Sequence, residues 1–367
     1  MKRITLTFLL LLFIEHISEA QFHTLNIPQI SNHVYEKQRL AVTDISIDYS
    51  SPSTNNRDVW NTPGIIPQNG NPIAWRAGAN MNTTISFSTD VMINGQVLKK
   101  GKYGFHIIPN GEDFTLLFAH NNNQWGSYYL DLEKDITLRV NVKSEACSFS
   151  EKLDYEFLKW QENAVTIALE WGEKRIPFEV SVDLNKTVVE SFRSELRGIN
   201  TYHWQAWNDA ANWCLNHNTN LEEALAWANR SINGGYNGFA ANRNVTNLIT
   251  KIRLQKALDR TAEMNATIDE AIQINMDVNQ ANYLSIMLLQ LGAVDQAHEL
   301  LSREIENNPE AWFLKLNQAI AYYYSGNKKK SLKALEQVYR VTPENFKARL
   351  DQIKSEIEND IYKIPSI

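Results

Sequence analysis

The sequence contains little cysteine: Cys147 and Cys214 are the only two in 367 residues. Two cysteines cannot make a disulfide framework, so apolar cores must stabilise the chain. We predict that both side chains are buried free thiols. A chain of this length exceeds what one compact core organises, and two domains are expected.

Clustered basic charge and the usual catalytic motifs are also missing. The formal net charge is -6, which argues against nucleic-acid binding, because that function requires a clustered Lys and Arg surface. The chain has no HExxH, C-x-x-C, G-x-S-x-G or glycine-rich phosphate loop. In the predicted hairpin about residues 109–112, His106 pairs near Thr115 and not with His120, so a two-histidine metal site is not expected. We predict no cofactor, no metal and no catalytic residues, and a binding role is favoured over an enzymatic one.

Long apolar runs are confined to residues 4–14, behind Lys2 and Arg3. Small residues at Ser18 and Ala20 complete the pattern of a signal peptide over residues 1–20, which cleavage would remove to leave Gln21 first. No Cys lies at the cleavage site, so a lipoprotein is not expected. We predict a periplasmic or secreted protein without a transmembrane segment after cleavage.

Residues 37–184 alternate apolar and polar side chains, as in residues 136–142, after an N-terminal extension at residues 21–36. This period predicts an antiparallel β-sandwich with one buried face per strand. Asn94-Gly95, between two short apolar runs, predicts a two-residue hairpin because both turn residues need positive φ.

The segment from Val59 to Met81 breaks this period, and long irregular loops are often functional. It offers an indole, a guanidinium and an amide that can stack on a ligand or donate to it. The candidate ligand-binding residues are Trp75, Arg76, Asn80, His106, Trp125 and Ser127. The competing interpretation is that the tryptophans are core, that Arg76 caps a loop, and that His106 is a satisfied strand histidine.

Several motifs occur in order: residues 47–52, 75–80, 83–91, Asn94-Gly95, 100–104 and 123–127. Together they resemble a bacterial exported family known as domain of unknown function 2911. The resemblance implies a fold and an exported setting, and it carries no reaction.

Residues 185–362 follow a helical period. Gly292 and Gly326 are 34 residues apart, and so are Pro309 and Pro343, which is the length of a tetratricopeptide repeat. A degenerate earlier unit spans residues 248–275, and a closing helix is predicted at residues 344–361. The fold class is therefore an antiparallel β-sandwich followed by a tetratricopeptide-like α-helical array.

The sequence favours an exported binding or scaffolding protein that binds a protein or peptide partner through its helical repeats. The alternative is a small-ligand or carbohydrate-binding module, or a β-sandwich enzyme, that uses the Trp75–Asn80 loop.

Overall fold

The computed structural model describes residues 28–67 and 74–365, so the predicted signal peptide lies outside the described residues. The chain divides between Ser181 and Val182 into two compact units, which we call the β-domain and the helical array. Across the described residues, every helix is too short or too polar to cross a bilayer.

One sheet of the β-domain has six antiparallel strands in the order β1-β2-β3-β6-β7-β8. Their bounds are β1 Asn32–Leu40, β2 Thr43–Ser51, β3 Thr83–Phe87, β6 Gly101–Asn110, β7 Asp113–Ala119 and β8 Ile136–Lys143. The second sheet has the order β5-β4-β10-β9. Its strands are β4 Val91–Ile93, β5 Gln96–Leu98, β9 Glu145–Leu158 and β10 Ala164–Ser181.

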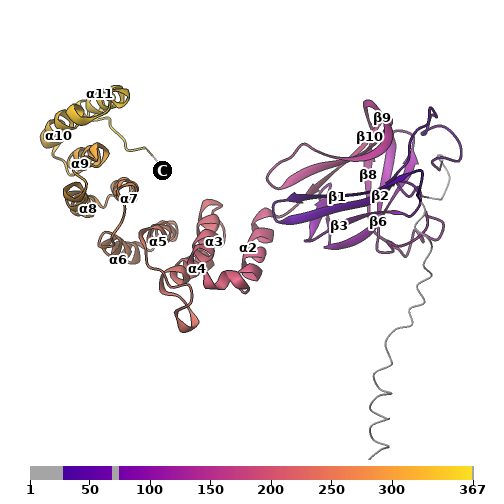
Figure 1. Ribbon diagram of the computed structural model, residues 1–367, viewed down its shortest axis with the longest axis horizontal. Helices are drawn as coiled ribbons and strands as arrows, with labels where there is room; N and C mark the ends of the chain where they lie inside the picture. Colours follow the sequence, from indigo (N-terminus) through magenta and orange to yellow (C-terminus); the bar gives the residue numbers. More distant parts are fainter. Residues whose placement is uncertain (1–27, 68–73, 366–367) are drawn as a thin grey trace, which may run out of the picture. The chain divides into compact units, whose positions relative to one another are not determined.

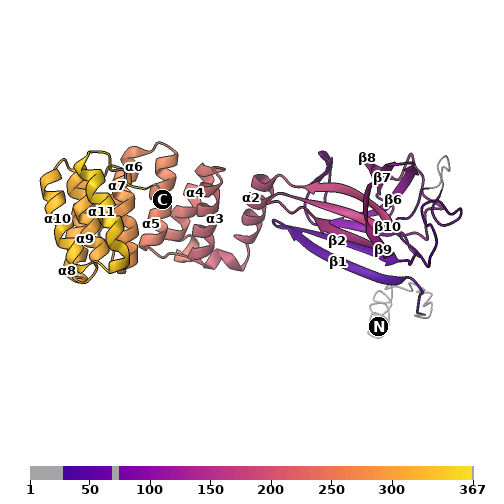
Figure 2. The ribbon, with the colours of Figure 1, turned by 90° about the horizontal axis from the view of Figure 1, so that it is seen from above.

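The two sheets lie face to face (Figure 2), and aromatic side chains pack between them. Phe105 of the first sheet lies 5.6 Å from Phe178 of the second, and Tyr49 meets Tyr155 edge-on at 4.8 Å. Phe105 and Tyr155 are almost fully buried, so these pairs form the core between the sheets. The predicted antiparallel sandwich is confirmed.

The short hairpin is also confirmed, with Ile93 opposite Gln96 and positive φ at Asn94 and Gly95. The β6–β7 register differs from the prediction, because His106 lies opposite Leu117. Both strands extend further toward the turn than expected, so that Asn110 pairs with Asp113.

Strand β1 begins at Asn32, within the segment that the sequence analysis assigned to an N-terminal extension. It is an edge strand, and most of its residues are exposed, which is why it lacks a clear apolar period. Among the cysteines, Cys214 is buried as predicted, whereas Cys147 is only half-buried; both are free thiols.

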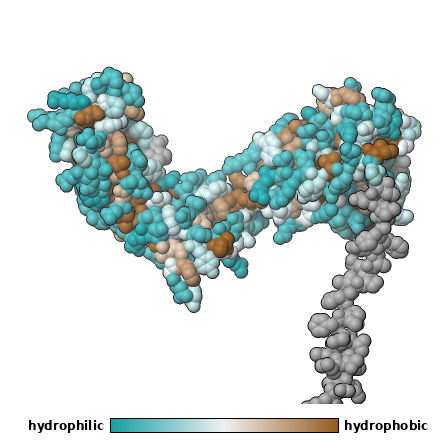
Figure 3. Space-filling model, viewed as in Figure 1, coloured by the Kyte–Doolittle hydropathy of each residue, from teal (hydrophilic) through white to brown (hydrophobic). Residues whose placement is uncertain are grey.

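The helical array consists of helices stacked in antiparallel pairs (Figures 1 and 2). The bounds are α2 Leu184–Glu195, α3 Trp204–Asn216, α4 Leu221–Asn233, α5 Val245–Ala257, α6 Thr261–Ala271, α7 Val278–Gln290, α8 Val294–Asn307, α9 Trp312–Tyr324, α10 Lys328–Val341 and α11 Glu344–Glu358. On the face in Figure 3, hydrophilic residues predominate and hydrophobic ones form small separate patches.

The repeat is visible in packing as well as in turns. Gly292 and Gly326 take left-handed φ values of 76° and 79° where α7 and α9 end. Small residues 34 apart, Ser285 with Ala319 and Ala297 with Ser331, are fully buried. Small side chains at these matched positions let neighbouring helices approach closely, so the tetratricopeptide-like architecture is confirmed.

Candidate ligand-binding cavity

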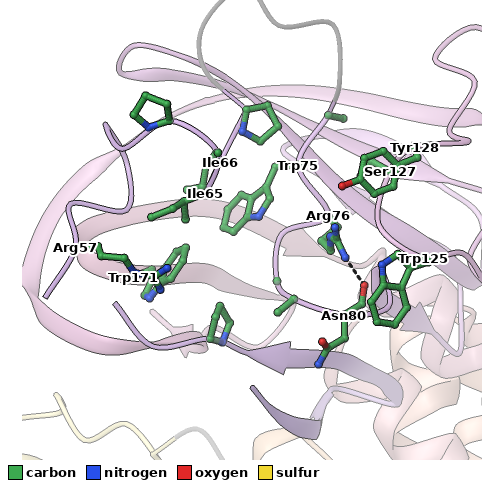
Figure 4. Close-up of a pocket in the computed structure, with 17 residues that line it drawn as sticks. Arg57, Ile65, Ile66, Trp75, Arg76, Asn80, Trp125, Ser127, Tyr128 and Trp171 are labelled. Carbon is green, nitrogen blue, oxygen red and sulfur yellow. Dashed lines mark hydrogen bonds between the residues drawn. The ribbon is translucent and has the colours of Figure 1, made fainter. Parts of the chain in front are cut away.

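A cavity of about 710 Å³ opens among the loops of the β-domain (Figure 4). Five of the six residues predicted from the sequence line it: Trp75, Arg76, Asn80, Trp125 and Ser127. The described residues that line it are Pro52, Arg57, Pro63, Gly64, Ile65, Ile66, Pro67, Ala74, Trp75, Arg76, Gly78, Ala79, Asn80, Trp125, Ser127, Tyr128 and Trp171. His106 is not part of the lining.

Trp75 forms the floor of the cavity and is itself part of the core. Its backbone N–H and C=O both bond to Ile107 of β6 at 2.8 Å, which attaches the loop to the sheet. Its indole stacks on Trp171 of β10, with ring centroids 6.0 Å apart and planes 13° apart. Trp75 is thus buried, whereas Trp125 is 56% exposed and its indole is available for stacking.

Hydrogen bonds to one carbonyl fix the loop between Trp75 and Asn80. The Ala77 carbonyl accepts from the Thr83 hydroxyl at 2.9 Å and from the Tyr155 hydroxyl at 2.8 Å. Ala77 and Asn80 both have left-handed φ, at 52° and 59°. The strained conformation persists because the surrounding bonds hold it, a pattern that is common at binding sites.

Arg76 extends from this fixed loop along one wall of the cavity. Its Nη1 donates to the Asn80 carbonyl at 2.5 Å, and its guanidinium lies 5.9 Å from the ring centre of Tyr128. Gly126 makes room for it, since a Cβ there would meet Arg76 Nη2 at 2.8 Å. The interpretation that Arg76 caps a loop is therefore correct for Nη1 of its guanidinium. Within the described residues, this is the one hydrogen bond that the Arg76 guanidinium donates.

A second arginine, which the sequence analysis missed, lies across the cavity from Asn80 (Figure 4). Arg57 donates from Nε to the Thr54 carbonyl at 2.7 Å and from Nη2 to the Ser53 carbonyl at 2.9 Å. The described lining contains these two cations and no Asp or Glu. Its electrostatic potential therefore favours an anionic group.

An unpaired donor accompanies the two cations. The indole N–H of Trp171 is buried and has no hydrogen-bond partner among the residues that the structure describes. A buried N–H without a partner costs free energy, about 1–3 kcal/mol. Trp171 lines the cavity, so an acceptor bound there would relieve that cost if it reached this enclosed nitrogen, which has almost no exposed surface.

His106 lies behind the lining and bonds to it through Ser127. Its Nδ1 is 2.7 Å from the Ser127 Oγ, and its side chain is fully buried. Burial, followed by the charge of Arg76, lowers the pKa of His106 to about 4, so the ring is neutral at pH 7. Its Nε2 has no described partner. If the proton lies on Nδ1, Nε2 carries an unpaired lone pair and not an unpaired N–H. The Nδ1–H then donates to the Ser127 Oγ, which leaves the Ser127 hydroxyl free to donate to a ligand.

A neighbouring cavity of about 640 Å³ provides a contrast. It shares Arg57 with the first cavity, but Asp58, Glu112 and Glu173 also line it. Its mixture of charges does not select an anion. The candidate site is therefore the cavity that contains Arg76.

Among the described residues, no group of three His, Cys, Asp or Glu side chains is placed to hold a metal ion. The polar groups that line the cavity include guanidinium, hydroxyl and indole groups.

Comparison with known proteins finds one family model that matches the β-domain. Residues 31–180 match the model described as "Protein of unknown function (DUF2911)", and the resemblance found in the sequence motifs is confirmed. No curated protein matches the chain.

Two solved structures are similar to this chain. One is a tetratricopeptide repeat protein from Parabacteroides merdae, at 16% identity and a TM-score of 0.37, covering 48% of this chain and 66% of that one. The other is YrrB, described as a TPR protein with an unusual peptide-binding site, at 18% identity and a TM-score of 0.26, covering 45% of this chain and 98% of that one.

Proposed function

We propose that the protein is a binding protein whose β-domain takes a small ligand carrying a carboxylate or phosphate group. The observation that carries this proposal is the pairing of Arg57 and Arg76 in a cavity whose described lining has no acidic residue. Arg presents a fixed fork of N–H donors that matches the geometry of these anions.

The rest of the lining favours a ligand with a ring. The exposed face of Trp125 can stack on a sugar or another flat group, and the Ser127 hydroxyl and Trp171 N–H can bond to oxygen atoms. A volume of about 710 Å³ lies within the range of small-molecule sites. A sugar acid combines these features, and it is the chemistry to test first.

A thermal-shift panel tests the proposal. Glucuronate and glucose differ in one carboxylate, and inorganic phosphate tests the anion alone. We expect glucuronate to raise the melting temperature and glucose to leave it unchanged, because a ligand that binds only the folded state stabilises it. An unchanged melting temperature with every anion would contradict the proposal.

The second candidate function is binding of a protein or peptide partner by the helical array. It is supported by the helices stacked in antiparallel pairs with a 34-residue repeat. Repeat arrays of this kind commonly present such surfaces to extended partners.

The location of the protein is also a proposal. The apolar run at residues 4–14 with Ser18 and Ala20 supports export and removal of residues 1–20. N-terminal mass spectrometry of the mature protein should find Gln21 as the first residue, and a retained Met1 would contradict export by this signal.

A further inference from the structure

The helical array already holds an extended segment, and that segment is part of its own chain. Residues 361–365, which we call the closing segment, follow α11 and run along the side of the array that α9 and α7 form (Figure 1). The surface beneath it consists of Gln290 at the end of α7 and of Tyr323 and Tyr324 at the end of α9. We call this surface the α7–α9 face.

The array contacts the closing segment in the way that a domain contacts an extended peptide. Tyr362 is 5% exposed and Ile364 is half-buried, whereas Ile361 and Lys363 point to solvent. Side chains at every second position thus face the array, which is the period of an extended backbone. Pro365 favours this conformation, because a proline restricts the residue before it to extended backbone angles.

The α7–α9 face contacts both the backbone and the side chains of the closing segment. The Ile364 N–H donates to the Tyr324 hydroxyl at 2.9 Å, and the Gln290 side-chain amide donates to the Pro365 carbonyl. The Tyr362 ring lies edge-on to Tyr323 at 6.1 Å and to Tyr324 at 6.4 Å. Backbone bonds combined with recognition of alternate side chains are how domains bind extended peptides.

A turn at the end of α11 delivers the segment to the face. Asp360 takes a left-handed φ of 57° and ends the helix. Lys328 Nζ lies 2.7 Å from both the Glu358 carbonyl and the Asp360 carboxylate. Because the segment is tethered beside the face, its effective concentration is high, on the order of millimolar for a short linker, even when its intrinsic affinity is weak.

We propose that the α7–α9 face is a binding site for an extended segment of a partner protein, and that the closing segment occupies it as an intramolecular competitor. The partner segment presents an aromatic residue, an aliphatic residue two positions later, and then proline. A longer segment of this pattern displaces the closing segment by adding contacts beyond its five residues. This inference rests on the second candidate function and is independent of the β-domain cavity.

The test uses the full chain and a fluorescent peptide with the sequence of residues 360–365. The release variant, Tyr362→Ala/Ile364→Ala, removes both inward side chains of the closing segment. The matched control, Ile361→Ala/Lys363→Ala, removes the two outward ones. By fluorescence anisotropy, we expect the release variant to bind the peptide at least about tenfold more tightly than the wild type and the control. A peptide with Ala at the tyrosine position should not bind.

Equal peptide affinity for all three proteins would overturn the proposal. So would loss of the helical melting transition in the release variant and also in a milder Tyr362→Leu variant, because the segment would then be part of the core. A wild-type dimer that the release variant loses would assign the face to a second copy, and would also overturn it. The peptide assay needs no natural partner, so failure of this proposal can be distinguished from failure of the partner-binding function. That failure would appear as no complex with any exported protein, even for the release variant.

Discussion

The cavity of the β-domain and the α7–α9 face differ in whether their polar groups have partners. In the cavity, the Trp171 indole N–H and most of the Arg76 fork lack acceptors among the described residues. On the face, the Tyr324 hydroxyl and the Gln290 amide bond to the chain's own backbone. The unpaired donors support the proposal that the cavity binds a ligand. The paired groups of the face support the proposal that the closing segment occupies a binding site.

The largest expected effect concerns the floor of the cavity. Trp171→Ala removes the indole that stacks on Trp75, and it should lower the free energy of unfolding by about 3–5 kcal/mol. Trp171→Phe keeps an aromatic ring and removes the N–H. It should therefore destabilise the protein much less and still weaken binding of glucuronate. Urea melts and ligand titration of both variants measure the two effects separately. Full ligand affinity in Trp171→Phe would show that the unpaired N–H has no role in binding.

The second effect is a dependence on pH. The pKa of His106 is about 4 in the folded protein, against an ordinary value of 6.5, so the unfolded chain binds more protons between these values. Stability should therefore fall as the pH falls from about 6.5 to about 4, by about 3 kcal/mol from this residue. His106→Gln cannot take up this proton, and its stability should change less across the same range. Urea melts at each pH test this, and parallel curves for the two proteins would contradict it.

The third effect separates binding from folding at Arg76. Arg76→Lys keeps the charge and loses the fork, and affinity for glucuronate should fall roughly tenfold to a hundredfold. Stability should fall by only about 1 kcal/mol, because one hydrogen bond to the Asn80 carbonyl is lost. Calorimetric titration and thermal melts measure both quantities. A large stability loss with unchanged affinity would make Arg76 a structural residue alone.

The smallest effect concerns the α7–α9 face. Tyr324→Phe removes the hydroxyl that accepts from the Ile364 N–H and should cost about 1 kcal/mol or less. Placed in the release variant, the same substitution should weaken peptide binding several-fold. Unchanged peptide affinity would show that this backbone bond does not contribute to recognition.

Local sequence signals predicted most of the fold. Asn94-Gly95 determines its own turn, and the 34-residue spacing of the helix-ending glycines locates the repeats. Asp259, with φ 56°, ends α5 in the left-handed conformation that glycine takes in the later units, which explains why that earlier unit looked degenerate.

The composition of the sites was less predictable, because distant segments build them. The motif at residues 75–80 pointed to the cavity, but Arg57 and Trp171 reach it from elsewhere in the chain and follow no local pattern. His106 was predicted to contact a ligand, and it lies instead behind Ser127. The predicted closing helix at residues 344–361 ends at Glu358, because Asp360 reverses the chain. The alternation of residues 361–365 was too short to recognise as a bound strand.

Titration calorimetry tests the central claim, anion binding in the β-domain, most directly. The wild type is titrated with glucuronate and with glucose, and Arg57→Gln/Arg76→Gln is titrated in parallel. We expect glucuronate to bind the wild type, glucose to bind far more weakly, and the double variant to lose glucuronate binding while keeping a cooperative thermal melt. Equal binding of the two sugars, or glucuronate binding that survives in the double variant, would contradict the account.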